Sequence, residues 1–184
     1  IRGSATEIPT IQENWSKVSL PDTWIKRWPD YTGGVWYRIN WQLNCKKQNI
    51  HNESLAFTIN RITMAGKAYI NQDLIWQDNS LVEPFSRSWN KPIYGPIPPS
   101  SIQPGENFLY IYVAGLPVNR PGLGEVALGQ SKNILNIYEE DVWSQRTIFI
   151  INICLSITLG AICSCIWFFR KKEQAFGWFG LCTI

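Results

Sequence analysis

Two hydrophobic patterns divide this chain. Over residues 20–140, short apolar stretches alternate with polar residues and are separated by clusters of Pro, Gly and Asn. Such stretches are typical of short β-strands joined by turns. Over residues 147–169 the chain reads TIFIINICLSITLGAICSCIWFF and contains no charged residue. The first pattern predicts a β domain, and the second predicts one long apolar helix.

The clearest strand in the first region covers residues 35–43. Alternate residues of a strand share one face, and here that face carries Val35, Tyr37, Ile39, Trp41 and Leu43. Further strands are expected at residues 55–59, 67–71, 74–76, 108–113 and 126–128, with a short one near Ile93. No helical period is sustained before the apolar run. This succession predicts an all-β jelly-roll sandwich followed by a transmembrane α-helix.

The apolar run is long enough to cross a membrane. It contains 23 residues, and roughly 20 helical residues span a bilayer core. The alternative is a buried core helix, which is usually shorter and carries a polar stripe. The polar residues Asn152, Ser156, Thr158 and Ser164 do not line one helical face. We therefore interpret residues 147–169 as a transmembrane helix in contact with the lipid bilayer.

Charges at the two ends of the run predict its orientation. Arg170, Lys171 and Lys172 follow it, and positive flanks mark the cytoplasmic side. Residues 1–146 are then extracytoplasmic, residues 170–175 form a cytoplasmic turn, and residues 176–184 begin a second transmembrane helix. The sequence has no initiator Met and stops within an apolar stretch. We accordingly expect a piece of a polytopic membrane protein.

Charge and cysteine usage exclude several classes of function. The net charge is +3, but residues 1–145 hold 13 basic and 13 acidic residues, 13 − 13 = 0, so the excess belongs to the membrane flanks. Nucleic-acid binding would need a basic patch on the domain itself. Cys45 is the one cysteine before the apolar run, and His51 is the one histidine. A disulfide framework and a His/Cys zinc site are therefore excluded, and no cofactor is expected.

Three motifs in the β region fall in a recognisable order. They are Gly34-Val-Trp36-Tyr37-Arg38, then Lys67-Ala-Tyr-Ile70-Asn71, then Pro104-Gly-Glu-Asn107-Phe-Leu-Tyr-Ile-Tyr-Val113. Their order resembles the galactose-binding-like jelly-roll domain of β-galactosidase-type glycoside hydrolases. It is closer to the extracytoplasmic domain of bacterial sensors that precedes a seven-transmembrane module. One departure is Gln72, where the hydrolase-type domain usually has Gly after Asn.

The resemblance implies a function and a location. It covers residues from about Leu20 onward and implies a jelly-roll sensor domain at 20–140 and a bacterial inner-membrane receptor that acts as a homodimer. The polar residues before it predict an irregular N-terminal segment at residues 1–19. A histidine kinase or diguanylate cyclase would follow in the parent protein, and this fragment itself would not be an enzyme. A second hypothesis is a membrane-anchored carbohydrate-binding module. A third is an enzyme, but no pair of carboxylates placed for glycoside hydrolysis and no Gly-x-Ser-x-Gly motif is evident.

Two groups of residues are candidates for ligand binding. Arg61 follows a strong strand, whereas Glu83, Arg87 and Asn90 lie in the Pro-rich connection over residues 83–105. Together they suit a small polar ligand such as a carbohydrate or a carboxylate; the alternative is a salt-bridged loop lid.

Trp36 and Arg38 share the other face of the first strand. They form either a ligand platform or, with Tyr37 in the core, a structural contact in which Arg38 bridges to a carboxylate.

Overall fold

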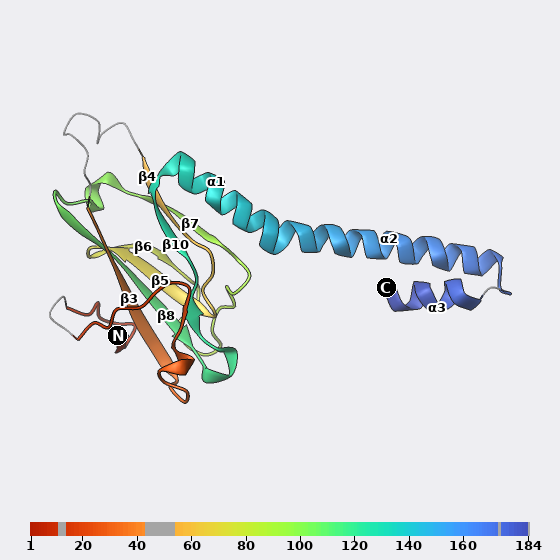
Figure 1. The fold of residues 1–184 in the computed structure, drawn as a ribbon, viewed down its shortest axis with the longest axis horizontal. Coiled ribbons are helices and arrows are strands. Elements are labelled where there is room, and N and C mark those ends of the chain that lie inside the picture. Colours follow the sequence, from red (N-terminus) through yellow and green to blue (C-terminus); the bar gives the residue numbers. More distant parts are fainter. Residues whose placement is uncertain (11–13, 43–53, 173, 184) are drawn as a thin grey trace. The chain divides into compact units, whose positions relative to one another are not determined.

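The computed structural model describes residues 1–10, 14–42, 54–172 and 174–183. Cys45 and His51, which enter the cysteine and zinc arguments above, lie outside these residues. The chain divides into two compact units, Ile1–Asp141 and Val142–Ile184. The first unit is the β domain and the second is helical (Figure 1).

The larger sheet of the β domain has five antiparallel strands in the order β1-β3-β8-β5-β6. Their bounds are Arg2–Gly3 for β1, Gly33–Gln42 for β3, Ala65–Ile70 for β5, Asp73–Gln77 for β6 and Glu106–Gly115 for β8. The central pair, β3 and β8, is in register from Gly33 opposite Gly115 to Gln42 opposite Glu106. This pair is the longest continuous ladder of the described chain.

The second sheet has three antiparallel strands in the order β10-β4-β7. These strands are Leu55–Ile59 (β4), Ile93–Ile97 (β7) and Val126–Gln130 (β10). A short ribbon pairs Asp22–Thr23 (β2) with Gly122–Leu123 (β9). Short 3₁₀ turns cover Trp24–Lys26, Pro99–Ser101 and Pro117–Asn119. Each strand expected from the sequence is present to within a few residues.

The main core lies between the two sheets. Val35 and Tyr37 of β3 pack in one cluster with Phe57 and Ile59 of β4, and Ile39 and Trp41 pack against it. The alternation predicted for β3 is therefore confirmed over its described residues. Burying such side chains contributes about 25 cal/mol per Å² of apolar surface, and this is the main force holding the sandwich closed. The predicted jelly-roll sandwich is confirmed.

A second cluster covers the outer face of the larger sheet. Trp36, Tyr110, Tyr112 and Ala114 form it, and the N-terminal residues pack on top of them. The sequence predicts an irregular segment over residues 1–19, whereas the structure includes Arg2–Gly3 in the sheet as β1. Lys67 is 5% exposed in this cluster. Its Nζ donates to the Ala5 carbonyl and to Tyr69 Oη and lies 5.5 Å from the Trp36 ring centroid, contacts that compensate a buried charge.

Asn71 closes the β5–β6 hairpin in a left-handed conformation, with φ of 55°. Asn is one of the few residues that adopts this conformation readily. Its Nδ2 donates to the Ser101 carbonyl at 2.8 Å and to Asn107 Oδ1 at 3.0 Å, and its Oδ1 accepts from the Phe108 amide at 3.0 Å. The hairpin therefore forms with Gln72 in place of Gly, because Asn71 supplies the left-handed residue.

A helix precedes the apolar run, so the prediction of no helix before it is wrong. Helix α1 covers Ser131–Val142. Ile134 is buried, and the Tyr138 ring lies 5.7 Å from that of Tyr94. The spacing of Ile134, Ile137 and Tyr138 is helical, but it extends over barely two turns and ends in three acidic residues. A pattern this short is easily read as a strand or a connection.

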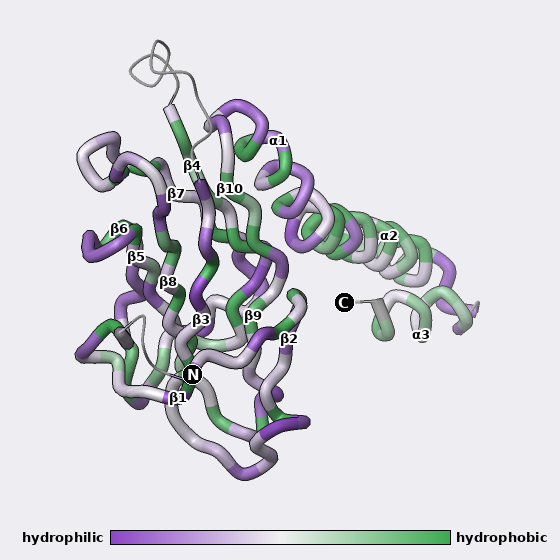
Figure 2. Tube along the Cα trace, turned by 60° about the vertical axis from the view of Figure 1, so that its left-hand side comes forward, coloured by the Kyte–Doolittle hydropathy of each residue, from purple (hydrophilic) through white to green (hydrophobic). Residues whose placement is uncertain are grey.

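The second unit contains the apolar helix. A π-helical turn covers Trp143–Thr147, α2 covers Ile148–Phe169 and α3 covers Gln174–Thr183. Among the described residues, one helical run, Ser131–Phe169, is long and apolar enough to cross a membrane. Figure 2 shows that α2 is hydrophobic along most of its length. Its large apolar side chains are exposed and Gly160 is its one buried residue, as expected for a helix in lipid rather than in a protein core.

Helix α3 packs against α2 through small residues. A Cβ atom added to Gly180 would lie 2.5 Å from Ser164 Oγ and 3.2 Å from the Gly160 carbonyl oxygen. Small residues at such contacts let two membrane helices approach closely. Ser164 is therefore part of a helix–helix contact between α2 and α3.

Candidate functional site

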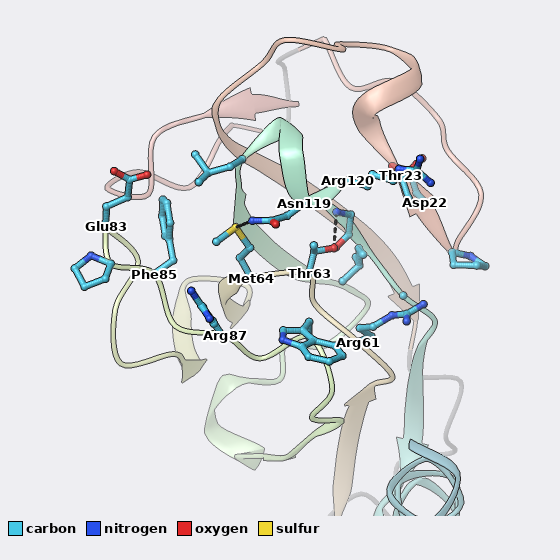
Figure 3. Close-up of a pocket in the computed structure, with 17 residues that line it drawn as sticks. Asp22, Thr23, Arg61, Thr63, Met64, Glu83, Phe85, Arg87, Asn119 and Arg120 are labelled. Atoms are coloured by element: carbon cyan, nitrogen blue, oxygen red, sulfur yellow. Dashed lines mark hydrogen bonds between the residues drawn. The ribbon is translucent and has the colours of Figure 1, made fainter. Parts of the chain in front are cut away.

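A pocket of about 1090 Å³ lies beside the β2–β9 ribbon (Figure 3). Four separate stretches of the chain supply its lining. They are Pro21–Thr23, the loop after β4, the connection between β6 and β7, and the loop after β8. The lining residues with charged or aromatic side chains are Asp22, Arg61, Glu83, Phe85, Arg87, Trp89 and Arg120.

The loop after β4 is hydrogen-bonded to the two residues between β9 and β10. The Gly124 amide donates to the Arg61 carbonyl at 2.8 Å, and the Asn60 amide donates to the Glu125 carbonyl at 2.9 Å. Gly124 is required here because a Cβ would lie 3.0 Å from the backbone N and O of Arg61. These contacts fix the position of Arg61 on the pocket wall.

Met64 anchors the other side of the pocket. Its side chain is largely buried, its sulfur accepts from Asn119 Nδ2 at 3.2 Å, and its carbonyl accepts from the Ser88 amide at 3.0 Å. Ser88 in turn donates to Asp78 Oδ1 at 2.7 Å. Arg87 and Trp89 flank Ser88, so these hydrogen bonds hold both of them at the pocket.

Asp22 is engaged within the domain. Arg27 donates two hydrogen bonds to its carboxylate, at 2.8 and 2.6 Å, and Tyr37 Oη donates one at 2.8 Å. Burial pushes the pKa of Asp22 upward, but these hydrogen bonds and the Arg27 charge outweigh it and hold that pKa below its ordinary value. Burial and the adjacent carboxylate raise the pKa of Tyr37. Asp22 thus serves the fold, and its charge is already compensated.

The other charged groups of the pocket are exposed. Arg61, Arg87, Arg120 and Glu83 all reach solvent. Glu83 and Arg87 form no ion pair with each other, so the bridge that a salt-bridged lid would need is not present between these two described residues. Figure 3 shows Glu83, Phe85 and Arg87 on one side of Met64 and Asp22 and Thr23 on the other. Three exposed arginines therefore belong to the lining of this pocket.

The candidate residues named from the sequence separate into three groups. Arg61, Glu83 and Arg87 line this pocket together, whereas Asn90 is exposed and not part of its lining. Trp36 and Arg38 line a different hollow of about 620 Å³ beside the N-terminal segment.

The surroundings of Trp36 and Arg38 are largely structural. The Trp36 ring is 1% exposed and its Nε1 donates to the Ser4 carbonyl. The Arg38 guanidinium lies 4.6 Å from the Trp15 ring centroid. Tyr37, between them in the sequence, donates from its Oη to the carboxylate of Asp22.

Arg120 is the pocket residue that sequence reasoning missed. It lies in a Pro- and Gly-rich loop after β8 and adopts a left-handed conformation, with φ of 47°. Nothing in that loop's pattern distinguishes a binding residue from a solvated one. It lines the same pocket as Arg61 because the fold brings two distant loops to one side of the sandwich, which sequence spacing does not show.

No family model matches the chain, and no curated protein matches it. Among solved structures, it is similar to the beta-glucuronidase of Faecalibacterium prausnitzii, with 17% identity and a TM-score of 0.46 over 62% of this chain and 19% of that one. It is also similar to the beta-D-glucuronidase of Dictyoglomus thermophilum, with 17% identity and a TM-score of 0.42 over 56% and 17%. The chain therefore spans less than a fifth of the length of these enzymes.

Proposed function

We propose that residues 1–141 form the ligand-sensing extracytoplasmic part of a bacterial membrane signal-transduction receptor. One hydrogen bond carries this proposal: Asn60 Nδ2 donates to Asp141 Oδ1 at 2.6 Å. Asn60 precedes the pocket residue Arg61, and Asp141 lies in the last turn of α1. The pocket wall is thereby tied to the helix that leads into the apolar run.

This contact gives a ligand a means of acting on α1. A ligand shifts an equilibrium only by binding two states with different affinity. A ligand that moves the Asn60–Arg61 backbone would lengthen or shorten the bond to Asp141. Burial raises the pKa of Asp141, as do the nearby Glu125 and Glu140, while the Asn60 hydrogen bond opposes them. Loss of the Asn60 bond would therefore leave this carboxylate poorly stabilised.

The parent receptor is proposed in outline. The positive flank at residues 170–172 favours a cytoplasmic location for that turn, and the resemblance described above favours an inner-membrane homodimer with a histidine kinase or diguanylate cyclase as output. The proposal gives the β domain no catalytic step.

A second candidate function is a membrane-anchored carbohydrate-binding module. The observation that favours it is Trp89, which is 54% exposed on the pocket wall. Exposed indoles suit stacking on a sugar ring, and such a module needs no communication with the membrane helix. The two functions differ in whether α1 responds when the pocket is filled.

Hydrogen exchange distinguishes the two functions. The full chain is placed in lipid nanodiscs, and exchange is measured with D-galactose, D-galacturonate or malonate as the probe. For a receptor, a bound probe slows exchange in the loop after β4 and also changes exchange in Ser131–Val142. In Asn60→Ala, the loop response persists and the helix response is lost. The matched control Asn79→Ala removes an exposed amide that does not line the pocket and should behave as the wild type.

A binding module without signalling predicts a different exchange pattern in α1. If a probe protects the pocket loop of the wild-type chain while the amides of α1 exchange at an unchanged rate, the chain is an anchored binding module.

A further inference from the structure

The pocket beside the β2–β9 ribbon carries excess positive charge. Its lining contains the cations Arg61, Arg87 and Arg120 and the anions Asp22 and Glu83. The Asp22 charge is neutralised by Arg27, which is not part of the lining. The remaining balance is three cations against one anion, 3 − 1 = +2. No side chain among the described residues pairs with these three arginines.

The arginines come from three different loops. Arg61 follows β4, Arg87 lies in the connection between β6 and β7, and Arg120 follows β8. Hydrogen bonds hold the first two loops in place, from the Gly124 amide after β9 to the Arg61 carbonyl and from the Ser88 amide to the Met64 carbonyl. The fold therefore places three arginines from different loops along one pocket lining, with Arg87 on the side of Phe85 and Arg120 on the side of Asp22 (Figure 3). Guanidinium presents paired N–H donors that match the two oxygens of a carboxylate.

Apolar and aromatic side chains form the rest of the wall. Phe85, Trp89, Met64 and Leu116 line the pocket alongside the arginines. A flat indole that is half exposed offers a surface for a ring rather than for a bare ion. The volume of about 1090 Å³ is at the upper end of the range for small-molecule sites, and it accommodates more than one sugar ring.

We propose that this pocket binds an anionic saccharide, a sugar ring bearing a carboxylate. The carboxylate is held by the guanidinium group of Arg87, the ring lies against Trp89, and Arg61 and Arg120 add positive charge to the same lining. This inference rests on the proposed function for the place of the site and adds the chemical class of its ligand. Glu83, the one uncompensated anion of the lining, is available to accept a hydrogen bond from a ring hydroxyl.

Calorimetric titration of the full chain in nanodiscs tests the proposal. D-Galacturonate, D-galactose and malonate are compared as a charged ring, a matched neutral ring and a charged molecule without a ring. Galacturonate should bind at least about tenfold more tightly than galactose, because charge-assisted hydrogen bonds contribute more than neutral ones. It should also bind more tightly than malonate, and raising the salt concentration should weaken its binding.

Single substitutions assign the contacts. Arg87→Gln, Arg61→Gln and Arg120→Gln should each weaken galacturonate binding by about tenfold and leave galactose binding little changed. Trp89→Ala should weaken both sugars and leave malonate unchanged. Lys26→Gln is the control, since Lys26 is exposed and lines neither this pocket nor the hollow beside the N-terminal segment. It removes the same charge and should have no effect.

Several results would overturn the proposal. If galactose binds as tightly as galacturonate, or if galacturonate does not bind at millimolar concentration, the ligand is not an anionic saccharide. If malonate binds as tightly as galacturonate, the pocket does not recognise a sugar ring. If Lys26→Gln weakens galacturonate binding as much as Arg87→Gln does, the ligand is attracted by the overall positive charge and not by contacts in the pocket.

The results that contradict the anionic ligand can be told apart from those that contradict the receptor function, because ligand binding and the response of α1 are measured separately. A neutral sugar that binds and alters α1 would leave the receptor standing without an anionic ligand. Galacturonate that binds without altering α1 would leave the site standing without a receptor.

Discussion

At the scale of single residues, Asp22 is the clearest determinant of acid stability. Its folded-state pKa lies below the ordinary value of 3.8. A lowered pKa means that ionised Asp22 stabilises the fold above about pH 4 and that this stabilisation is lost as pH falls through the folded-state pKa. Asp22→Asn should therefore lower the free energy of unfolding at pH 7 by about 1–3 kcal/mol. Chemical denaturation at pH 7 and pH 3 measures the effect.

The difference between wild type and Asp22→Asn should shrink toward pH 3. Asp30→Asn changes the same charge at an exposed position and should have little effect at either pH. An equal loss of stability at both pH values would show that packing, not ionisation, makes Asp22 important.

Single residues of the motifs that resemble known jelly rolls have structural roles in this domain. Asn71 and Asn107 belong to the segments that resemble known jelly rolls, and both are used to build turns. Asn107 is 0% exposed, and its side chain exchanges two hydrogen bonds with the backbone of Gln103. These motifs thus predict the fold well, because turn geometry needs particular residues locally. They contain no information about a ligand.

At the scale of elements, the strands were predictable and α1 was not. Strands such as β4 and β8 combine β-branched and aromatic residues with adjacent turn signals, so local pattern decides them. Helix α1 depends on tertiary contacts of Ile134 and Tyr138, which a single sequence does not display.

Asp141 gives a prediction at this scale. Its pKa is raised in the folded domain, so ionisation opposes folding, and the penalty grows as pH rises from the ordinary Asp value through the folded-state pKa. Asp141→Asn, which keeps an oxygen acceptor for Asn60, should raise the unfolding free energy at pH 7 by less than about 1 kcal/mol. The gain should disappear below pH 4 in the same denaturation experiment. Glu139→Gln, on the exposed face of α1, is the control; a stabilisation of equal size there would point to general charge repulsion.

At the scale of the whole molecule, the apolar run and its flanks predict topology. The extent of the apolar helix needs no tertiary information, since the length of the uncharged run predicts it, and α2 ends at Phe169, as the sequence predicts. The orientation predicted from the charged flanks stays a prediction. The pocket could not be predicted as completely: Arg61, Glu83 and Arg87 were named, but Arg120 was missed and Asn90 lies elsewhere, because the meeting of distant loops decides membership.

A reporter fusion tests the orientation. Alkaline phosphatase, which is active only outside the cytoplasm, should be inactive when fused after Lys172 and active when it is fused after Gln145. A cytoplasmic reporter such as green fluorescent protein should show the reverse pattern. Phosphatase activity at Lys172 would contradict the predicted orientation.

The burial of Lys67 under the N-terminal residues has a practical consequence. Its ammonium group is covered by Ala5 and surrounded by aromatic rings, whereas Lys26 and Lys132 are exposed. An acylating reagent should therefore modify Lys67 far more slowly than the other two, at a rate set by how often the first residues lift from the sheet. The rate of Lys67 acylation, measured by mass spectrometry at successive times, would then report how often the N-terminal segment detaches from the sheet.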